Sequence, residues 1–464
     1  MDQPPPPSTS TTDTAISNPN PNPNRTKPLP KRFVKSAIPE SLLSSPSLLS
    51  AISLLPRNYS FEIPKTLHRI STLSARRVVL QLPDGLLMFS LPIADILRTF
   101  SPSPSPSPSP SPSPVEVSVL AEPTYGACCV DDLSAASLHA DLLVHYGHSC
   151  LVPVNTSKIP TLYIFVEIKI DPERIISSIT SNFPPSNSKS SPIALAGTVQ
   201  FISAVHSVKS KLLEAGYDVI VPQSRPLSAG EVLGCTSPTI PKSKGVETAI
   251  FVADGRFHLE AFMIANPGVR TFRFDPFLGV LVLEEYDHEG MKRVRKDVIF
   301  KAREAKTWGV ILGTLGRQGS TRVLDRIVNK MEDKGLDYTV VMMSEISPAR
   351  VELFGDSVDA WVQIACPRLS IDWGEGFRRP VLTTFEFDVA MGDVPGWWER
   401  RRSSSECGRN CSGSGGTCGS CGCGVDEGEE SNYPMDYYAQ DGGEWNSSYV
   451  KKKTTTIRET ARVL

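Results

Sequence analysis

A short apolar run followed by an amphipathic helical pattern occurs three times along this chain of 464 residues, and this repeat most constrains the fold. The apolar runs lie at 78–82, 193–199 and 310–315. The helices expected after them span 86–100, 201–215 and 321–334. Three further apolar runs follow in each repeat, at 115–121, 142–146 and 161–168, at 218–222, 249–253 and 270–274, and at 338–343, 359–365 and 381–387.

Near-continuous apolar runs are typical of strands in a parallel sheet, because helices cover both faces of such a sheet. Strands that alternate with helices indicate βαβ units with right-handed crossovers. We therefore predict an α/β fold with three similar four-stranded parallel domains in a pseudo-threefold arrangement.

Changes in composition mark the expected domain limits. Residues 1–30 are rich in Pro and Asn, and residues 396–464 begin with a Gly/Ser/Cys-rich stretch, so we predict two disordered tails. The three domains are expected at 31–184, 185–300 and 301–395. Seven Ser-Pro dipeptides at 101–114 predict an extended surface insertion within the first domain, because proline fixes φ and removes a hydrogen-bond donor.

Charge and hydropathy narrow the class of protein. The formal net charge is −2, which disfavours a protein that mainly neutralises nucleic-acid phosphates. The sequence contains no run of 18 apolar residues, so no membrane span is predicted. The N-terminus lacks the apolar core of a secretory signal. A cytoplasmic protein is therefore expected, and in that reducing compartment its ten cysteines should be thiols rather than disulfides.

Three cysteines follow predicted strands, one in each domain. Cys128 and Cys235 follow the second strand of their domains, and Cys366 follows the third strand of the last domain. Ligands collect beyond the carboxyl ends of parallel strands, so three domains could bring these thiols to one point. Thiolates select iron–sulfur clusters, zinc or copper, and such distant positions are unlike the paired ligands of structural zinc sites. The alternative for each cysteine is a small buried apolar side chain.

A second group of cysteines lies in the C-terminal tail, at Cys407, Cys411, Cys418, Cys421 and Cys423. Their spacing is like that of metal ligands, but the surrounding Gly and Ser residues offer no core to hold a site. We interpret this segment as a disordered tail. Removal of residues 400–464 is accordingly expected to leave the predicted metal site intact.

The three body cysteines lie in the motifs EPTYGACCVDD, GEVLGCTSP and ACPRLSIDWG, and these resemble the diphthamide biosynthesis family. The segments LPDGLL, HYGHSC, ADGRFHLE and LGRQGS are also similar, so the resemblance covers roughly residues 31–395. It implies a [4Fe–4S] cluster held by Cys128, Cys235 and Cys366. It also implies transfer of a 3-amino-3-carboxypropyl group from S-adenosylmethionine to a histidine of translation elongation factor 2, by radical chemistry without a CxxxCxxC loop.

The resemblance further implies partners and an electron source. The family works in eukaryotes as a heterodimer with a related subunit that lacks the full cysteine set, so the three cysteines here favour the iron–sulfur subunit. Electrons are expected from a small metal-binding protein of the same pathway. No nucleic acid or membrane partner is expected.

Two residues are candidates for contact with the S-adenosylmethionine co-substrate. Arg368 could pair with its carboxylate, since arginine binds carboxylates with two hydrogen bonds, but a plain salt bridge is an equal alternative. Gln318 could hydrogen-bond to the same molecule, or LGRQGS could be a surface turn. For the whole chain, the alternatives are a zinc-binding scaffold without redox chemistry and a nucleotide-binding α/β transferase with buried structural cysteines.

Overall fold

The structure is a computed structural model that describes residues 38–101, 114–121, 126–149, 151–152, 154, 156–184, 191–399 and 432–447. All helices and strands lie in one compact unit, Pro39–Leu464. The predicted tail at 1–30, residues 102–113 of the Ser-Pro insertion and the cysteines at 407–423 lie outside the described residues.

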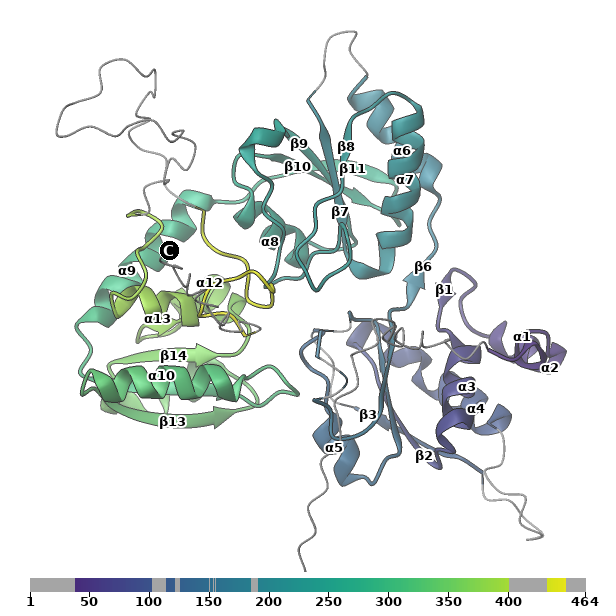
Figure 1. Ribbon diagram of the computed structural model, residues 1–464, viewed down its shortest axis with the longest axis horizontal. Coiled ribbons are helices and arrows are strands. Elements are labelled where there is room, and N and C mark those ends of the chain that lie inside the picture. Colours follow the sequence, from purple (N-terminus) through teal and green to yellow (C-terminus); the bar gives the residue numbers. More distant parts are fainter. Residues whose placement is uncertain are drawn as a thin grey trace, which may run out of the picture. The chain divides into compact units, whose positions relative to one another are not determined.

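Three separate sheets follow one another along the chain (Figure 1). The first contains β2 (Arg77–Gln81), β3 (Glu116–Leu120), β4 (Leu142–Tyr146) and β5 (Thr161–Ile164). The second contains β7 (Ile193–Gly197), β8 (Val219–Ile220), β9 (Thr248–Val252), β10 (Arg270–Asp275) and β11 (Val280–Glu284). The third contains β12 (Thr307–Gly313), β13 (Asp337–Met343), β14 (Ala360–Ile364) and β15 (Val381–Leu382).

The three sheets share one strand order. The orders are β3-β2-β4-β5, β11-β10-β9-β7-β8 and β13-β12-β14-β15. When the second sheet is followed from its β8 edge, the strands of every sheet lie in the order second, first, third and fourth, counted along the chain. These four strands are parallel in every sheet, and β11 adds an antiparallel edge strand to the second. The prediction of three similar parallel α/β sheets is therefore confirmed, whereas their pseudo-threefold arrangement stays a prediction.

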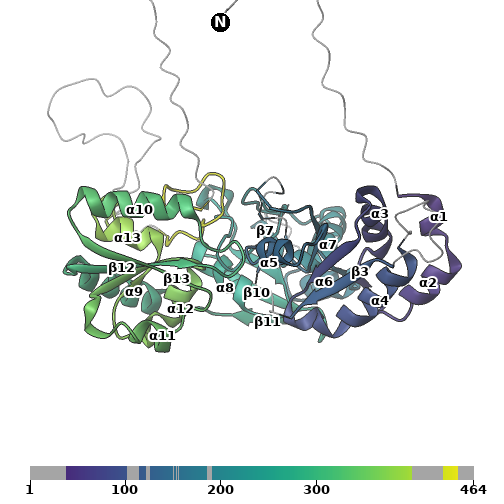
Figure 2. The ribbon, with the colours of Figure 1, turned by 90° about the horizontal axis from the view of Figure 1, so that it is seen from below.

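Helices pack on the sheets through apolar stripes, as α10 illustrates (Figure 2). Its buried residues Val323, Ile327 and Met331 recur every four positions and join the core around the third sheet. The α-helices of the described residues are α1 (Glu40–Leu43), α2 (Pro46–Ile52), α3 (Ile63–Leu73), α4 (Ser90–Phe100), α5 (Asp132–Ser137), α6 (Pro172–Asn182), α7 (Ile202–Glu214), α8 (Phe257–Ala265), α9 (His288–Arg303), α10 (Thr321–Asp333), α11 (Pro348–Glu352), α12 (Arg368–Trp373) and α13 (Thr384–Ala390).

Two of the predicted fourth strands end earlier than expected. The run at 381–387 forms a strand only to Leu382, because Thr383 and Glu386 make a reciprocal capping box that begins α13. The run at 161–168 divides into β5 and β6 (Glu167–Ile168), and Val166 between them has a φ of +54°. Strand β6 pairs with β1 (Tyr59–Ser60) outside the main sheet.

Residues 432–447 pack against the body of the protein, which differs from the tail predicted for 396–464 (Figure 1, yellow). Tyr433 and Met435 are buried in the core around the third sheet, and the Trp445 ring contacts Phe385 with centroids 4.9 Å apart. The composition around this segment is rich in Gly and polar residues, and that average conceals the aromatic side chains that become buried.

Candidate functional site

Cys128 lies in the loop between β3 and α5, at the carboxyl end of the first sheet, as predicted. Its side chain is buried. Gln81, at the end of β2, holds this loop through two hydrogen bonds. Its Nε2 donates to the Cys129 carbonyl at 2.7 Å, and its Oε1 accepts from the Asp131 N–H at 3.1 Å. The first sheet therefore fixes the position of the loop that carries Cys128.

Cys235 lies in a tight turn after β8. The N–H of Leu233 donates to the carbonyl of Thr236 at 2.9 Å, and the turn leaves Cys235 at its tip with a buried side chain. Gly234 is required by space, because an added Cβ would lie 2.1 Å from the ring of Phe257. The second sheet and the start of α8 thus position the second cysteine.

Cys366 lies between β14 and α12, at the carboxyl end of the third sheet. Gln363 Nε2 donates to the Cys366 carbonyl at 2.9 Å and to the Ser370 hydroxyl oxygen at 3.2 Å. The side chain of Gln363 is buried, so this connection between the strand and the helix is fixed from within the core.

The three cysteines affect one another electrostatically, which indicates that their sulfur atoms share one neighbourhood. Burial raises the pKa of Cys235, and the nearby Cys366 and Cys128 raise it further. Burial and Cys128 raise the pKa of Cys366 to about 12. A hydrogen bond with Cys129 and burial raise the pKa of Cys128. Each of the three sheets contributes one thiol to this cysteine site, defined by Cys128, Cys235 and Cys366.

Apolar residues enclose much of the cysteine site. Cys128 and Cys235 belong to one buried cluster, whose other members are Ala127, Cys129, Leu151, Leu227, Leu233, Tyr437 and Tyr438. Among the described residues, no three His, Cys, Asp or Glu side chains lie close enough to hold one metal ion. An iron–sulfur cluster differs from a single ion because its own iron and sulfide atoms stand between the thiolates that hold it.

One buried polar atom at the cysteine site has no hydrogen-bond partner among the described residues. Whether an iron–sulfur cluster could supply that partner indicates whether the site suits such a cluster. The hydroxyl of Tyr437 is fully enclosed and makes no hydrogen bond there. Burial raises the pKa of Tyr437, and the neighbouring Cys235 raises it further. A buried hydroxyl without a partner is costly, so an acceptor is expected beside it. Thiolates and cluster sulfides are such acceptors, and the donor set therefore fits an iron–sulfur cluster.

The loop LGRQGS, after β12, contacts the Cys128 loop directly. The N–H of Arg317 donates to the Cys128 carbonyl at 2.9 Å. Gly316 has a φ of +54°, and an added Cβ there would lie 2.5 Å from the Cys129 backbone. Gln318 Nε2 lies 4.0 Å from Cys129 Sγ, so this side chain is at the site, and its contact with S-adenosylmethionine stays a prediction.

Asp132 and Arg317 join loops of the first and third sheets beside the cysteine site, and neither was predicted from the sequence. Two hydrogen bonds of 2.7 Å connect the Arg317 guanidinium to the buried Asp132 carboxylate. The Lys158 N–H also donates to Asp132, at 2.6 Å. Burial alone would raise the pKa of Asp132, but the hydrogen bonds from Arg317 and Lys158 outweigh it and lower the pKa. The signal in the sequence that could have identified this ion pair is one charged residue in each loop, Asp132 in EPTYGACCVDD and Arg317 in LGRQGS.

Arg368 is almost fully buried, and its side chain bonds to acceptors of the protein itself. Its Nε donates to Asp372 at 2.8 Å, and one terminal nitrogen donates to Glu260 at 2.6 Å. The other donates to the Phe257 carbonyl at 2.7 Å, and the guanidinium stacks over the Phe257 ring. These contacts favour the salt-bridge alternative. Contact with the co-substrate stays a prediction.

A pocket of about 250 Å³ with apolar and polar lining residues adjoins the same apolar cluster through Leu233. It opens among the loops after β2, β4, β7 and β9. His148 Nδ1 and Thr198 Oγ1 are buried there without a hydrogen-bond partner among the described residues. Burial lowers the pKa values of His148 and His258 to about 4, so both imidazoles are neutral at pH 7. The pocket therefore offers neutral hydrogen-bonding groups.

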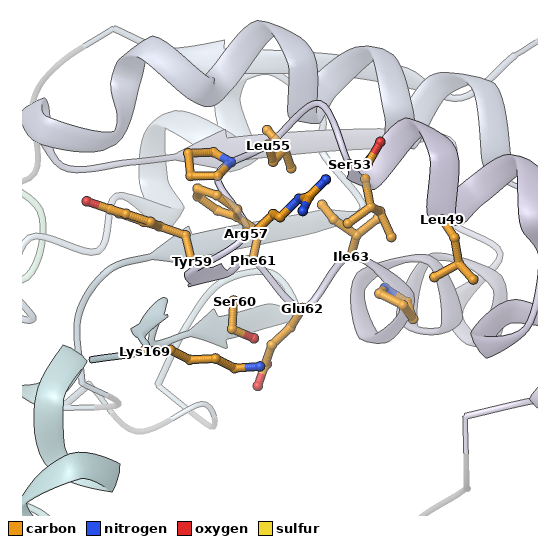
Figure 3. Close-up of a pocket in the computed structure, with 13 residues that line it drawn as sticks. Leu49, Ser53, Leu55, Arg57, Tyr59, Ser60, Phe61, Glu62, Ile63 and Lys169 are labelled. Carbon is orange, nitrogen blue, oxygen red and sulfur yellow. The ribbon is translucent and has the colours of Figure 1, made fainter. Parts of the chain in front are cut away.

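A hollow of about 430 Å³ lies elsewhere, around the connection from α2 to α3 (Figure 3). Its lining includes Leu49, Leu55, Phe61 and Lys169. None of the five predicted site residues lines it, and it carries no part of the function argued below.

The chain is similar in sequence to known proteins. The chain matches the family described as "Putative diphthamide synthesis protein" over residues 82–402. It is similar to proteins named 2-(3-amino-3-carboxypropyl)histidine synthase subunit 1. That of Homo sapiens is 47% identical over 79% of this chain and 79% of the relative. That of Schizosaccharomyces pombe is 48% identical over 79% of this chain and 81% of the relative. That of Gibberella zeae is 44% identical over 87% of this chain and 78% of the relative.

The fold is also similar to solved structures. The crystal structure of Dph2 from Pyrococcus horikoshii with a 4Fe-4S cluster superposes with a TM-score of 0.58 at 25% sequence identity. The match covers 73% of this chain and 92% of that one. A second crystal structure of the same archaeal protein gives a TM-score of 0.57 over 72% of this chain and 91% of that one.

Proposed function

Because the chain belongs to the diphthamide synthesis family, we propose that it is the iron–sulfur subunit of a 3-amino-3-carboxypropyltransferase. The donor is S-adenosylmethionine, and the acceptor is a histidine of translation elongation factor 2. The reaction is the first step of diphthamide synthesis. The observation that supports the proposal is that the thiols of Cys128, Cys235 and Cys366, which follow strands of three different sheets, lie near enough to raise one another's pKa. Cys128 and Cys235 also share one buried apolar cluster.

The three thiolates would hold a [4Fe–4S] cluster and leave one iron without a protein ligand. When bound, the cluster supplies the single electron that a radical cleavage of the sulfonium requires. The separation of the ligands over three domains suits this role, since each domain needs to provide only one sulfur.

The residues around the cysteines would position the reactants and exclude water. Leu151, Leu227 and Leu233 lie in the cluster that encloses Cys128 and Cys235, so solvent is kept from reactive species there. The ion pair of Asp132 with Arg317 holds the Cys128 loop against the third domain. A site built from three domains depends on such contacts for its geometry.

The partners follow from the same proposal. The chain works with the related second subunit, receives electrons from a small metal-binding protein, and acts in the cytoplasm on elongation factor 2. The name "subunit 1" of its relatives supports a multisubunit enzyme. In the part of the chain that the structure describes, no helix is long and apolar enough to cross a membrane.

Metal analysis tests the proposal. The chain is purified without oxygen together with its partner subunit, and iron, sulfide and zinc are measured before and after reduction with dithionite. We expect about four iron and four sulfide per chain and an electron paramagnetic resonance signal on reduction. The Cys366→Ala variant should lose both, whereas Cys418→Ser, in the predicted tail, should keep them.

Two other results would each support a different function. One zinc per chain without iron would support the scaffold alternative, in which the partner carries the chemistry. A protein without any metal, with Cys366→Ala unchanged in activity, would support a transferase with structural cysteines.

A further inference from the structure

Residues 432–447 are bonded to the turn that carries Cys235. The Ser237 N–H donates to the Met435 carbonyl at 2.8 Å, and the Tyr437 N–H donates to the Cys235 carbonyl at 3.2 Å. The Tyr438 N–H donates to the Thr236 hydroxyl at 3.0 Å. Asp436 thereby forms an antiparallel bridge with Thr236 of the turn. We call residues 432–447 the C-terminal strap.

The strap has a structure of its own. Asp436 accepts hydrogen bonds from Trp445 Nε1 at 2.9 Å and from the Gly443 N–H at 3.1 Å. The side chain of Asn446 is buried and donates to the Ala439 carbonyl at 2.7 Å. These bonds close residues 436–446 into a compact loop, so the strap keeps a defined shape over the cysteines.

Both neighbouring domains hold the strap. In the second domain, the Ala265 carbonyl accepts from Asn432 at 2.9 Å, and the Arg225 carbonyl accepts from the Gln440 N–H at 2.8 Å. In the third domain, Thr384 donates to the Trp445 carbonyl at 2.8 Å. The strap therefore connects the two domains that carry Cys235 and Cys366.

Two adjacent tyrosines of the strap face the cysteines. Tyr437 and Tyr438 are buried, and their rings meet edge to face with centroids 5.0 Å apart. Tyr438 lies in the same buried cluster as Cys128, and it lowers the pKa of the Cys128 thiol, which Cys129 and burial raise. Tyr437 lies beside Cys235, and its hydroxyl has no partner among the described residues. The strap thus brings both tyrosines into the buried cluster that contains Cys128 and Cys235.

We propose that the C-terminal strap completes the cysteine site, and that Tyr438 and Tyr437 are positioning residues whose hydroxyls bond to sulfur and whose rings exclude solvent. The proposal rests on the proposed function, since it gives these tyrosines a role toward the cluster. Hydrogen bonds to the sulfurs and exposure to solvent are among the factors that set the reduction potential of an iron–sulfur cluster. A hydrogen bond from Tyr438 to the Cys128 thiolate would stabilise the more negative, reduced form of a bound cluster and so raise this potential.

The first experiment compares the full chain with a chain that ends at residue 431, each with its partner subunit. In cluster-free protein, we expect the shortened chain to show at least tenfold faster alkylation of Cys128 and Cys235 by iodoacetamide. In cluster-loaded protein, its absorbance should bleach faster in air. Equal alkylation rates would overturn the strap as a cover. This readout needs no iron, so it stays informative even if metal analysis contradicts the proposed function.

The second experiment keeps the strap and removes one hydroxyl. Tyr438→Phe should retain its iron and sulfide but show a more negative reduction potential and an altered electron paramagnetic resonance spectrum. Tyr433→Phe is the matched control, because that hydroxyl bonds to Glu386 at 3.0 Å, and its potential should not change. An unchanged potential in Tyr438→Phe would contradict the positioning role.

Discussion

Asp132 is a buried carboxylate whose partner comes from a loop of another sheet. It lies four residues after Cys128, and its charge is balanced by Arg317 from the loop after β12. The carboxylate has no exposed surface, whereas the guanidinium keeps 29% of its own exposed. Its contribution to stability therefore falls between those of a surface ion pair and a fully buried one.

The Asp132→Asn variant should lower the free energy of unfolding by about 2 kcal/mol at pH 7, because Arg317 loses its counter-charge. The pKa of Asp132 is lowered in the folded protein, so the ion pair stabilises fully above the unfolded pKa of about 4 and is lost as the pH falls through the folded value. Urea unfolding of both proteins should therefore show a constant difference from about pH 5 to 7 that shrinks below about pH 4. A difference that grows on acidification would contradict this assignment.

Arg368 shows that residue type alone does not separate a ligand contact from a structural one. Arginine suits a carboxylate of S-adenosylmethionine as well as one of the protein. Here the Arg368 guanidinium forms ion pairs with the carboxylates of Asp372 and Glu260, and it also stacks on the Phe257 ring.

At the scale of elements, α13 is held by interactions of very different strength. The buried Glu386 receives two hydrogen bonds from the buried Arg295 of α9, at 2.7 and 2.6 Å. It also accepts from the backbone N–H of Thr383, which completes the capping box. One carboxylate therefore both begins the helix and neutralises a charge in the core.

These two roles separate in a pair of variants. Glu386→Gln leaves the Arg295 charge buried without a counter-charge and should lower the free energy of unfolding by about 3–5 kcal/mol. Thr383→Ala removes the cap and a long 3.4 Å contact with the Tyr433 hydroxyl, and it should lower the free energy of unfolding by about 1 kcal/mol. Guanidinium unfolding at pH 7 measures both. Equal losses would show that the ion pair adds little beyond the cap.

At the scale of the whole molecule, the cysteine site depends on how closely the LGRQGS loop of the third sheet approaches the Cys128 loop. Gly316 makes this approach possible, because its positive φ and missing side chain let LGRQGS lie against the Cys129 backbone. No other residue type meets both requirements without strain.

The Gly316→Ala variant should therefore disturb the site more than the fold. The added methyl group would lie 2.5 Å from the Cys129 backbone, so the two loops must separate. We expect reduced iron content after anaerobic purification, with a circular dichroism spectrum like that of the parent. Gly335→Ala is the control, since it also has a positive φ but an added Cβ there meets no atom within 4 Å. Equal iron loss in both variants would assign the effect to backbone strain.

The sequence by itself determined the three repeated sheets, their core strands and helices, and that each of the three cysteines follows a strand of a different sheet. These are local properties, because apolar runs and helical periodicity are set by neighbouring residues. Only the tertiary structure decided that Asp132 meets Arg317, that Arg368 is bonded to protein carboxylates, and that residues 432–447 pack against the turn that carries Cys235. Such contacts join residues far apart in the chain, and their partners depend on how the domains pack rather than on any local pattern.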